Sequence, residues 1–545
     1  MRNTAKTSPS KSSSYNWNKL FVALLAMTMV VSLSACSSDD DETVTDGTET
    51  GTNTGTSTNT STTTGSSSSI TITDTNTSGT AEGGSQTAEN EDDLIANSTF
   101  SSVVKIVYSG TSATVTNPLD GNGVTVTTNG GDVTVNATVA AVEYELSGTT
   151  TSGSFKIYSD KKFKLTLNGV SITNNDGPAI NIQSGKRVFV VLNSGTTNSL
   201  TDSASYSTPS DEDAKGTFFS EGQLIFSGTG ALNVAGKYKH GIVSDDYVRV
   251  IEGNITVTEA VSDAIHANDA FIADGGTLNL KASSDGIDAD KGYIVINGGN
   301  FTINVADDGI AASYDTDTTI DPYVTINGGT FNIKTAGGEG IESKSTLTIN
   351  DGDITINAYD DGINATSAIF INGGNIYIKS STNDAVDSNG TLTITGGRIV
   401  AIGASSPEAA FDNDNNTFKI TGGTLIGIGG SSSTPTASAS TQRSVLLGGY
   451  SANTIVNIQD ASGNEALTFL VPSSYTTMLY SSAKLQANTT YTVYTGGSVS
   501  GGTSFNGLYT AGTYSGGTKS STSFTTSSMV TSVGGSTGGG RWGGR

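Results

Sequence analysis

The sequence has little of several residue types, and each shortage excludes a class of protein. One cysteine among 545 residues leaves no partner for an intramolecular disulfide. Two histidines and that one cysteine exclude a Cys/His nucleophile and disfavour a Ser/His/Asp triad. Only 8 prolines and 14% charged residues, beside 68 glycines, do not describe a helical bundle or a coiled coil.

Basic residues are also scarce. The chain has 27 Lys and Arg against 51 Asp and Glu, which gives a formal net charge of −24. Such a surface repels nucleic acid and anionic lipid headgroups, and no basic stripe is present. The charge therefore favours metal cations or neutral polymers as partners, and we expect no nucleic acid partner.

An acidic phrase recurs through the middle of the chain, and most of its steps are 22 to 23 residues long. Its copies are Asp263-Ala-Ile-His266, Asp285-Gly-Ile-Asp288, Asp308-Gly-Ile-Ala311, Glu339-Gly-Ile-Glu342, Asp361-Gly-Ile-Asn364, Asp384-Ala-Val-Asp387 and Ala409-Ala-Phe-Asp412. A second phrase, Asn-Gly-Gly or a close variant, keeps step with it and is followed by short alternating runs such as Phe301-Thr-Ile-Asn-Val305. Period-two patterning without any helical pattern predicts an all-β solenoid of stacked strands, a parallel β-helix.

The first 36 residues have the pattern of a bacterial export signal. Positive residues precede an apolar run from Leu20 to Leu33, and Leu33-Ser-Ala-Cys36 resembles a lipobox. The run is short for a bilayer span of ~20 residues. We therefore expect lipidation of Cys36, a membrane contact through the lipid anchor only, and a location at the bacterial cell surface, in the outer membrane or envelope.

Composition then divides the rest of the chain. Residues 37–97 are rich in Ser, Thr, Gly and acids, which predicts a disordered tether. Residues 98–430 carry the strand patterning and form the predicted β-helix, with about 22–23 residues per turn. Residues 431–533 are the predicted C-terminal β-rich cap, because an open solenoid end exposes strand edges. Residues 534–545 read as a disordered tail, and we expect a monomer.

Stacked coils place equivalent residues in ladders at ~4.8 Å spacing. The predicted core ladder is Leu278, Phe301, Phe331, Ile354, Ile376 and Ile399. The predicted asparagine ladder is Asn297, Asn327, Asn350 and Asn372, with amides bonded to each other and to backbone groups.

The acids would stack in the same way, which is unfavourable. Two carboxylates ~4.8 Å apart repel by ~3 to 4 kcal/mol at an effective dielectric of ~20. Calcium would compensate, because it takes 6 to 8 oxygen ligands and can bridge adjacent turns. The candidate ligands are Asp285, Asp288, Asp308, Glu339, Glu342, Asp361, Asp384, Asp387, the loop acids Asp315, Asp317 and Asp321, and Asp412 with Asp414; Asn364 is a further oxygen donor in the second row. The alternative is that the ladder acids cap turns by accepting backbone hydrogen bonds.

Several phrases together resemble a family of exported bacterial carbohydrate-binding β-helix proteins. They are Leu167-Asn-Gly169, Gly177-Pro-Ala-Ile180, the Asp-Gly-Ile phrases, the Ile-Asn-Gly-Gly turns and Tyr491-Thr-Val-Tyr494-Thr-Gly-Gly with Tyr509. The resemblance implies a right-handed parallel β-helix similar to that of calcium-dependent polysaccharide lyases. It also implies calcium and the binding of cellulose or of acidic polysaccharides such as polygalacturonate. Ala311, Lys344, Ala409 and Ala410 depart from the acidic pattern and leave the number of ions open.

Three functions follow from these features. The first is calcium-dependent, non-catalytic polysaccharide binding, with Tyr293, Tyr314, Tyr323 or Tyr359 stacking on sugar rings. The second is a polysaccharide lyase whose base is Lys291 or Lys344, next to ladder acids. The third is a structural adhesin. A two-carboxylate hydrolase has no specific signal, because the ladder offers many acid pairs.

Overall fold

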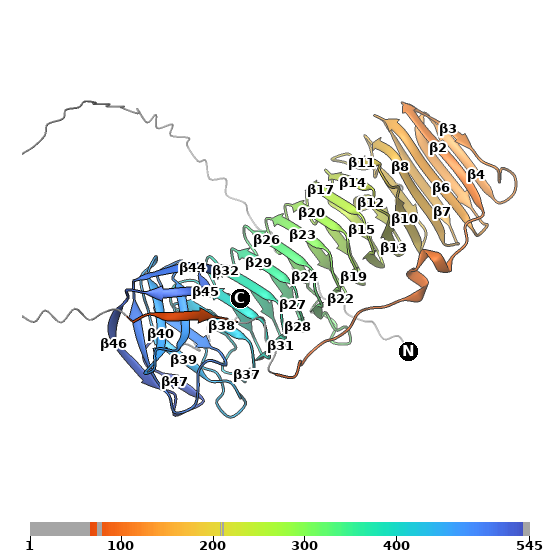
Figure 1. The fold of residues 1–545 in the computed structure, drawn as a ribbon. Helices are drawn as coiled ribbons and strands as arrows, with labels where there is room; N and C mark the ends of the chain where they lie inside the picture. The colour runs from red at the N-terminus through yellow and green to blue at the C-terminus, as the bar shows by residue number, and fades with distance from the viewer. Residues whose placement is uncertain (1–65, 73–78, 208, 210–211, 315, 538–545) are drawn as a thin grey trace, which may run out of the picture. The chain divides into compact units, whose positions relative to one another are not determined.

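The computed structural model describes residues 66–72, 79–207, 209, 212–314 and 316–537, and within them the chain is almost entirely β-strand. Its coils stack in parallel with three strands per coil, so three ladders run through the structure (Figure 1). The parallel β-helix expected from the sequence is confirmed. In the described part of the chain, no helix is long and apolar enough to cross a membrane.

The first ladder contains the short strands that follow the acidic phrases. Its strands are β4 (Val124–Asn129), β5 (Gly131–Ala137), β7 (Gly153–Ser159), β9 (Ile180–Gln183), β12 (Gly216–Ser220), β15 (His240–Ser244), β18 (Ile265–Ala267), β21 (Ile287–Ala289), β24 (Ile310–Ala312), β27 (Ile341–Ser343), β30 (Ile363–Ala365), β33 (Val386–Ser388) and β36 (Phe411–Asp412). Only β4 and β5 pair antiparallel; every later pair is parallel.

The second and third ladders hold the strands on either side of the Asn-Gly-Gly turns. The second contains β10 (Val188–Leu192), β13 (Leu224–Ser227), β16 (Tyr247–Val250), β19 (Ala270–Ala273), β22 (Tyr293–Ile296), β25 (Val324–Ile326), β28 (Thr346–Ile349), β31 (Ala368–Ile371), β34 (Thr391–Ile394) and β37 (Phe418–Ile420). The third contains β11 (Thr197–Thr201), β14 (Ala231–Gly236), β17 (Asn254–Ala260), β20 (Thr277–Ala282), β23 (Asn300–Val305), β26 (Thr330–Thr335), β29 (Asp353–Ala358), β32 (Asn375–Ser380), β35 (Arg398–Ile402) and β38 (Thr424–Gly429).

Both ends of the stack are closed by irregular pairings. At the start, β2 (Ser102–Gly110) folds back on β3 (Ser112–Thr116), and β6 (Val142–Thr150) and β8 (Phe163–Thr173) extend the stack. At the other end, β42 (Thr477–Ser481) pairs antiparallel with β38 and with β39 (Ser444–Gly448), which also pairs with β47 (Val530–Ser532). The expected C-terminal cap is therefore present, because parallel stacking stops there.

The cap also contains a separate antiparallel sheet. Its strands are β40 (Ile455–Asp460), β41 (Glu465–Leu470), β43 (Thr490–Thr495), β44 (Ser498–Phe505), β45 (Leu508–Ser515), β46 (Thr518–Thr525) and β1 (Ser68–Thr71). Residues 534–537 were expected to be disordered, but the Ser536 amide donates to Thr477 Oγ1 at 2.7 Å. The remainder of the expected tail lies outside the described residues.

The predicted core ladder is confirmed. Leu278, Phe301, Phe331, Ile354, Ile376 and Ile399 follow one another in register. Each is fully buried, and the rings of Phe301 and Phe331 stack with their centroids 4.8 Å apart. The second glycine of each Asn-Gly-Gly turn has a positive φ, +107° at Gly299, where a side chain would be strained.

The asparagine ladder is also confirmed, and each step has the same geometry. Asn327 Nδ2 donates to Asn297 Oδ1, Asn350 to Asn327 and Asn372 to Asn350, each at 2.8 Å. An amide nitrogen has a second hydrogen, and that hydrogen needs another acceptor.

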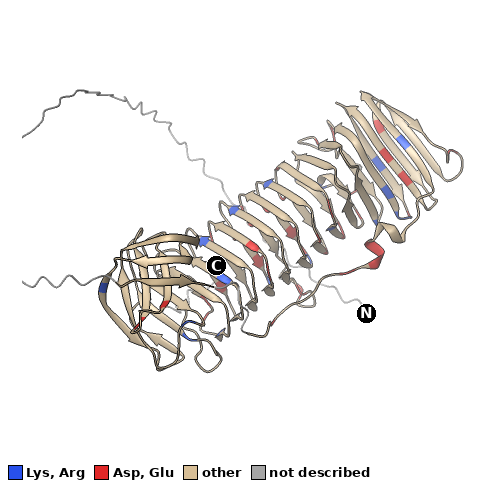
Figure 2. Cartoon of the chain, in the orientation of Figure 1, with Lys and Arg blue, Asp and Glu red and all other residues tan. Residues whose placement is uncertain are grey.

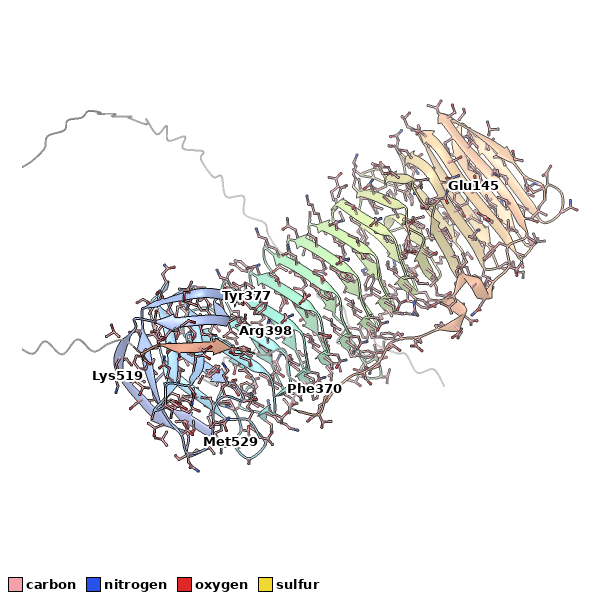
Figure 3. All side chains as sticks on the ribbon, viewed as in Figure 1. Glu145, Phe370, Tyr377, Arg398, Lys519 and Met529 are labelled. Atoms are coloured by element: carbon pink, nitrogen blue, oxygen red, sulfur yellow. The ribbon has the colours of Figure 1, made fainter. Side chains whose placement is uncertain are left out.

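Residues 79–97, named here the strap, supply those acceptors. The asparagines donate to the carbonyls of Thr87, Gln86, Gly84 and Glu82 at 2.7 to 2.9 Å, so the strap runs against the coil order. Gly83 lies against the ring of Phe370, and a Cβ on Gly83 would be 2.6 Å from that ring. Phe370 is labelled in Figure 3. The expectation of a disordered tether is wrong for the strap and for β1, because the coils provide the hydrogen-bond partners that composition could not reveal.

Asp93 anchors the far end of the strap. It lies in the short 3-10 helix η1 (Glu91–Asp93), whose acids are visible in Figure 2; η2 (Ile95–Asn97) follows. Asp93 accepts from Arg187 Nε at 2.8 Å and Tyr247 Oη at 2.6 Å, and Arg249 lies 3.2 Å away. The carboxylate is fully buried, and the two guanidinium groups compensate its charge.

Replacing Asn350 by alanine tests the joint between ladder and strap. The change removes bonds to Asn327, Asn372 and Gly84 and leaves their polar atoms without these partners. We expect a loss of about 2 kcal/mol in the free energy of unfolding, measured by urea denaturation.

The control is Asn332→Ala on an exposed position of β26, where a change within about 0.5 kcal/mol is expected. Equal losses for both variants would show that the asparagine ladder does not clamp the strap.

Candidate functional site

The acidic phrases line up in two rows beside the first ladder. In each coil the first acid precedes a short strand, and the residue three positions later lies within it. We name Asp263, Asp285, Asp308, Glu339, Asp361 and Asp384 the first acid row, and His266, Asp288, Ala311, Glu342, Asn364, Asp387 and Asp412 the second row. The register confirms that equivalent residues of successive phrases stack.

The middle of each phrase explains why the coils can approach so closely. Ile310 is fully buried in the core, while Gly309 faces the backbone of the next coil. A Cβ on Gly309 would collide with the carbonyl oxygen of Gly340. Glycine or alanine at this position therefore permits stacking, and stacking brings the acids together.

Backbone amides of the next coil donate to most carboxylates of the first acid row. Asp285 Oδ1 accepts from the Asp308 amide at 2.9 Å, Asp308 Oδ1 from Glu339 at 2.8 Å, and Asp361 Oδ1 from Asp384 at 2.9 Å. The capping role considered from the sequence is thus present. One such bond per carboxylate does not remove the repulsion between successive charges.

The pKa values of the row carboxyl groups are raised by burial and by that repulsion. Burial, followed by neighbouring acids, raises the pKa of Asp285 to about 8 and that of Asp308 to about 10. Burial and the charges of Asp387 and Asp384 raise the pKa of Asp361 well above its ordinary value. The side chains alone therefore favour protonation, unless a cation lies between them.

The second row carries partial compensation. Lys344 pairs with Glu342, and Ser313 Oγ donates to Asp288 Oδ1 at 2.8 Å. Asn364 Nδ2 donates to Asp387 Oδ2 at 2.8 Å. The departures from an all-acid pattern thus lower the charge of the row at particular coils.

The last coils open into a cavity of about 400 Å³. It is lined by Asn383, Asp384, Asp387, Asn389, Ser406, Pro407, Glu408, Asp412, Asp414, Ser431 and Ser536. Oxygens of Asp384, Asp387 and Asp412 lie within 4.8 Å of one another. Burial, followed by neighbouring acids, raises the pKa of Asp387 to about 7; burial and nearby acids also raise that of Asp384, to about 8.

Earlier coils bring together further acids, including two that sequence reasoning missed. Asp263, Asp285 and Asp288 form one group, and Asp285, Asp307 and Asp308 another. Asp263 begins the same phrase as the other ladder acids, so its spacing could have identified it. Asp307 gave no such signal, because it precedes the phrase.

The predicted loop acids do not join these groups. Asp317 Oδ1 accepts from the Thr319 amide at 2.9 Å, which is a local turn, and Asp321 is exposed. Neither belongs to a cluster of three donors among the described residues. Asp315 and Cys36 lie outside the described residues.

The two candidate lysines lack the surroundings of a general base. Lys344 is partly buried, which lowers its pKa, but the pairing with Glu342 and the charges of Glu339 and Asp308 outweigh burial and raise it. A base needs the opposite direction. Lys291 is about half exposed and lies 3.9 Å from Asp290, as in a surface ion pair.

Two tyrosines lie exposed beside the acid rows. Tyr359, a candidate from the sequence, is 48% exposed, and Tyr238, which sequence reasoning missed, is 42% exposed. Tyr238 lies two residues before His240 and Tyr359 two residues before Asp361, and these positions are equivalent in their coils. One face of Tyr238 stacks on Tyr206, with ring centroids 4.1 Å apart. Tyr293 and Tyr323 stack on each other, with ring centroids 4.9 Å apart, and Tyr314 is half-buried.

Comparisons with known proteins agree with a carbohydrate-binding assignment. The family described as carbohydrate-binding domain-containing protein matches residues 120–385 and 338–468, more than half of the chain. A relative of that description from Acetivibrio thermocellus is 33% identical over 118 residues, which are 21% of this chain. The match spans 41% of that relative's length.

A solved structure of a polysaccharide lyase-like protein from C. thermocellum, a gadolinium derivative, is 22% identical. The alignment covers 58% of this chain and 96% of that one, with a TM-score of 0.33. The assignment therefore depends on the family match, which spans most of the stacked coils. The chain belongs to the family of carbohydrate-binding domain-containing proteins.

Proposed function

We propose that this chain is a calcium-dependent, non-catalytic binder of an acidic polysaccharide such as polygalacturonate, acting at the bacterial cell surface. The observation that carries the proposal is the stack of buried carboxylates whose pKa values are raised by burial and by one another. Carbohydrate binding itself belongs to the family. The requirement for calcium and the acidic nature of the polymer go beyond the family match and are proposals.

The spacing of the acids fits calcium. Two oxygens on opposite sides of a calcium ion stand ~4.8 Å apart, because each bond is ~2.4 Å long. The oxygens of Asp384, Asp387 and Asp412 all fall within that distance, beside an open cavity. Asp414 and Glu408 line the same cavity and offer further oxygens. Bound calcium would supply positive charge to the acids and to a uronate carboxylate.

The exposed tyrosines support a polymer lying along the coil axis. Tyr238 and Tyr359 occupy equivalent positions five coils apart, which corresponds to ~24 Å at ~4.8 Å per coil. Tyr359 precedes Asp361 of the first acid row by two residues, and Tyr238 lies in the coil before that row begins. An extended polysaccharide could stack sugar rings on Tyr359 and on the face of Tyr238 that Tyr206 does not cover, while its carboxylates face the acid rows.

The non-catalytic part of the proposal is supported by the lysines. The raised pKa of Lys344 keeps its amine protonated near neutral pH, and Lys291 is about half exposed, close to Asp290 and near enough to Asp269 to act on its pKa. An ultraviolet assay for unsaturated uronate product is the direct check. Product formation that is lost in Lys344→Ala would favour a lyase instead.

Thermal stability in chelator tests the calcium part. Asp285, Asp384 and Asp387 have folded pKa values of about 8, 8 and 7, above the ordinary value near 4. Because the folded protein binds protons at these groups more tightly than the unfolded chain does, they stabilise the fold at low pH. This stabilisation is complete below about pH 4 and is lost as pH rises through 7 to 8. In EDTA the Tm should therefore fall between pH 5 and pH 9, and calcium should suppress the fall.

Asp361→Asn provides the matched test. The amide keeps an oxygen for the Asp384 N–H and removes a buried charge, so the variant should gain about 1 to 2 kcal/mol in EDTA at pH 8. Exposed Glu259→Gln should change nothing measurable. A Tm that changes neither with pH nor with calcium would contradict the proposal that the acid rows bind ions.

Binding to polygalacturonate tests the polymer. Calorimetry in calcium should give a measurable Kd that disappears in EDTA, and Tyr238→Ala or Tyr359→Ala should each weaken it about 5- to 20-fold. Val107→Ala, exposed on another part of the chain, serves as the control. Undiminished binding in EDTA would contradict the calcium bridge, while binding only to cellulose would contradict the acidic polymer.

The surface location rests on Cys36 and its lipobox-like surroundings. An alkyne-labelled fatty acid fed to bacteria expressing the chain should become attached to the wild type and not to Cys36→Ser. Equal labelling of both proteins, or none of the wild type, would contradict the anchor.

A further inference from the structure

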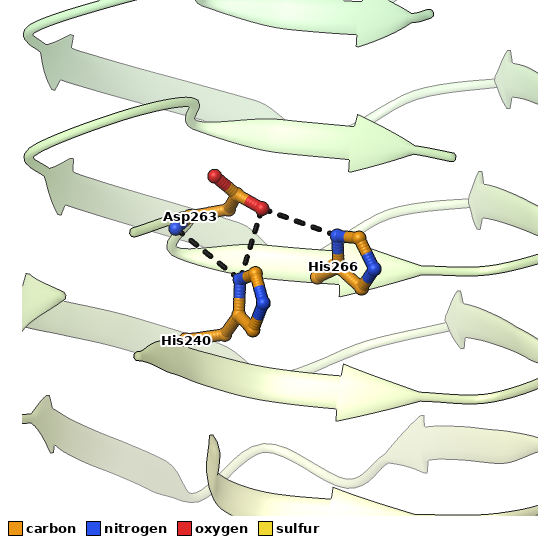
Figure 4. Close-up of side chains that lie close together, drawn as sticks. All are labelled: His240, Asp263 and His266. Atoms are coloured by element: carbon orange, nitrogen blue, oxygen red, sulfur yellow. Dashed lines mark hydrogen bonds and ion pairs between the residues drawn. The ribbon is translucent and has the colours of Figure 1, made fainter. Parts of the chain in front are cut away.

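Both histidines of the chain lie together at the start of the acid rows (Figure 4). His240 opens β15 and occupies the coil position that carboxylates hold in the first acid row. His266 lies in β18, in the second row. Their rings stack with centroids 4.4 Å apart and an interplanar angle of 23°.

Ligand atoms of His240, Asp263 and His266 lie within 4.8 Å of one another, and Asp288 adds a fourth ligand atom through its contact with His266. His240 Nδ1 lies 2.9 Å from Asp263 Oδ2, and His266 Nδ1 lies 3.1 Å from the same oxygen. His266 Nδ1 is also 3.1 Å from Asp288 Oδ2. The four residues come from three successive coils, and each is at least nine-tenths buried.

The convergence needs something positive between the atoms. A carboxylate oxygen and the bare nitrogen of a neutral imidazole both accept hydrogen bonds, so they repel at about 3 Å. Protons on the Nδ1 atoms give one solution, with His266 as an imidazolium between two aspartates. A metal cation in place of these protons gives the other.

The donor set distinguishes this cluster from the rest of the acid rows. Two imidazole nitrogens and two carboxylate oxygens suit zinc, nickel, cobalt or copper, whereas calcium prefers oxygen alone. Donors at ~2.0 to 2.1 Å from a tetrahedral ion stand ~3.3 Å apart, and the His240–Asp263, Asp263–His266 and His266–Asp288 contacts, at 2.9 to 3.1 Å, are close to that spacing. A small outward movement of the side chains would seat such an ion.

His240 presents its Nδ1 atom to the cluster. Its Nε2 atom is buried and has no hydrogen-bond partner among the described residues, so its polar contacts are made through Nδ1. The ring stacks on His266 and is almost fully buried, which limits its rotamers. The cluster is therefore held in one arrangement before any ion arrives.

We propose that His240, Asp263, His266 and Asp288 form a binding site for one divalent transition-metal ion of the zinc type, at the first coils of the acid rows. The ion displaces the protons held at the two Nδ1 atoms. The site differs in ligand chemistry from the calcium proposed for Asp384, Asp387 and Asp412, although it shares Asp263 and Asp288 with the acid group around Asp285. It does not depend on polysaccharide binding. It ties three coils together through side chains.

The test uses the mature chain without a histidine tag, stripped by chelator and titrated with Co²⁺ at pH 8. We expect one equivalent to give the visible absorption of tetrahedral cobalt with nitrogen ligands, and Zn²⁺ to abolish it by replacement. Millimolar Ca²⁺ should leave the spectrum unchanged. His240→Ala and His266→Ala should each weaken Zn²⁺ binding about 100-fold or more, measured against a chromophoric chelator.

Asp384→Asn is the matched control, because it removes an acid-row carboxylate far from the histidines, and its cobalt spectrum should match the wild type. His266→Gln, whose amide can still donate to both aspartates, keeps the fold assessable by circular dichroism. The absence of a cobalt spectrum in the wild type would assign the cluster to protons alone and overturn the proposal. Equal Zn²⁺ affinity in the wild type and the histidine variants would overturn it as well. Calcium-dependent polymer binding is measured separately, so failure of one proposal leaves the other standing.

Discussion

The structure depends on parallel stacking in which each residue lies over its equivalent in the next coil. This register rewards residues that pack well against copies of themselves. Isoleucine and phenylalanine do so in the core, where Phe301 and Phe331 stack almost face to face. Asparagine does so at the turns, because its side chain has both a donor and an acceptor. Carboxylates are the exception, since they repel their own copies, and an unpaired charge stack is costly.

The strap shows how one ladder recruits a distant segment. Asparagines in a row use one amide hydrogen for the next asparagine, which leaves one hydrogen per coil facing outward. A segment that presents a carbonyl to each coil satisfies them all, and residues 82–87 do so. Asp93 then fixes the end of that segment between two arginines. The strap is thus held largely by polar contacts, whereas β1 also buries Ile70 beside Ile455 and Tyr514.

Much of this architecture could be predicted from spacing. The phrase Asp-Gly-Ile determined the coil length, and the core ladder from Leu278 to Ile399 follows from the same count. The strap could not be predicted, because its order comes from partners more than 200 residues away. Composition alone indicated a tether, since the segment has few residues able to form a core of their own.

The candidate site could be predicted in part, for similar reasons. The stacking of Asp285, Asp308 and Asp361 follows from their period, but the loop around Asp317 does not bring its acids to the rows. The histidines were missed because His240-Gly-Ile is the repeated phrase with imidazole in place of the carboxylate, and a search for acids passes over it. Tyr238 was missed because its local sequence does not resemble that around Tyr359. Only the alignment of the coils shows that the two tyrosines occupy equivalent positions, both exposed.

The central claim is that the stacked carboxylates near the last coils share a cation. The most direct measurement is a crystal structure of the mature chain grown in calcium at pH 8, with anomalous data and a matched crystal soaked in EDTA. We expect an anomalous peak between Asp384, Asp387 and Asp412, with bond lengths of ~2.3 to 2.6 Å, that vanishes in EDTA. Only water at that position in calcium, with carboxylates in hydrogen-bonding contact as protonated pairs, would contradict the account.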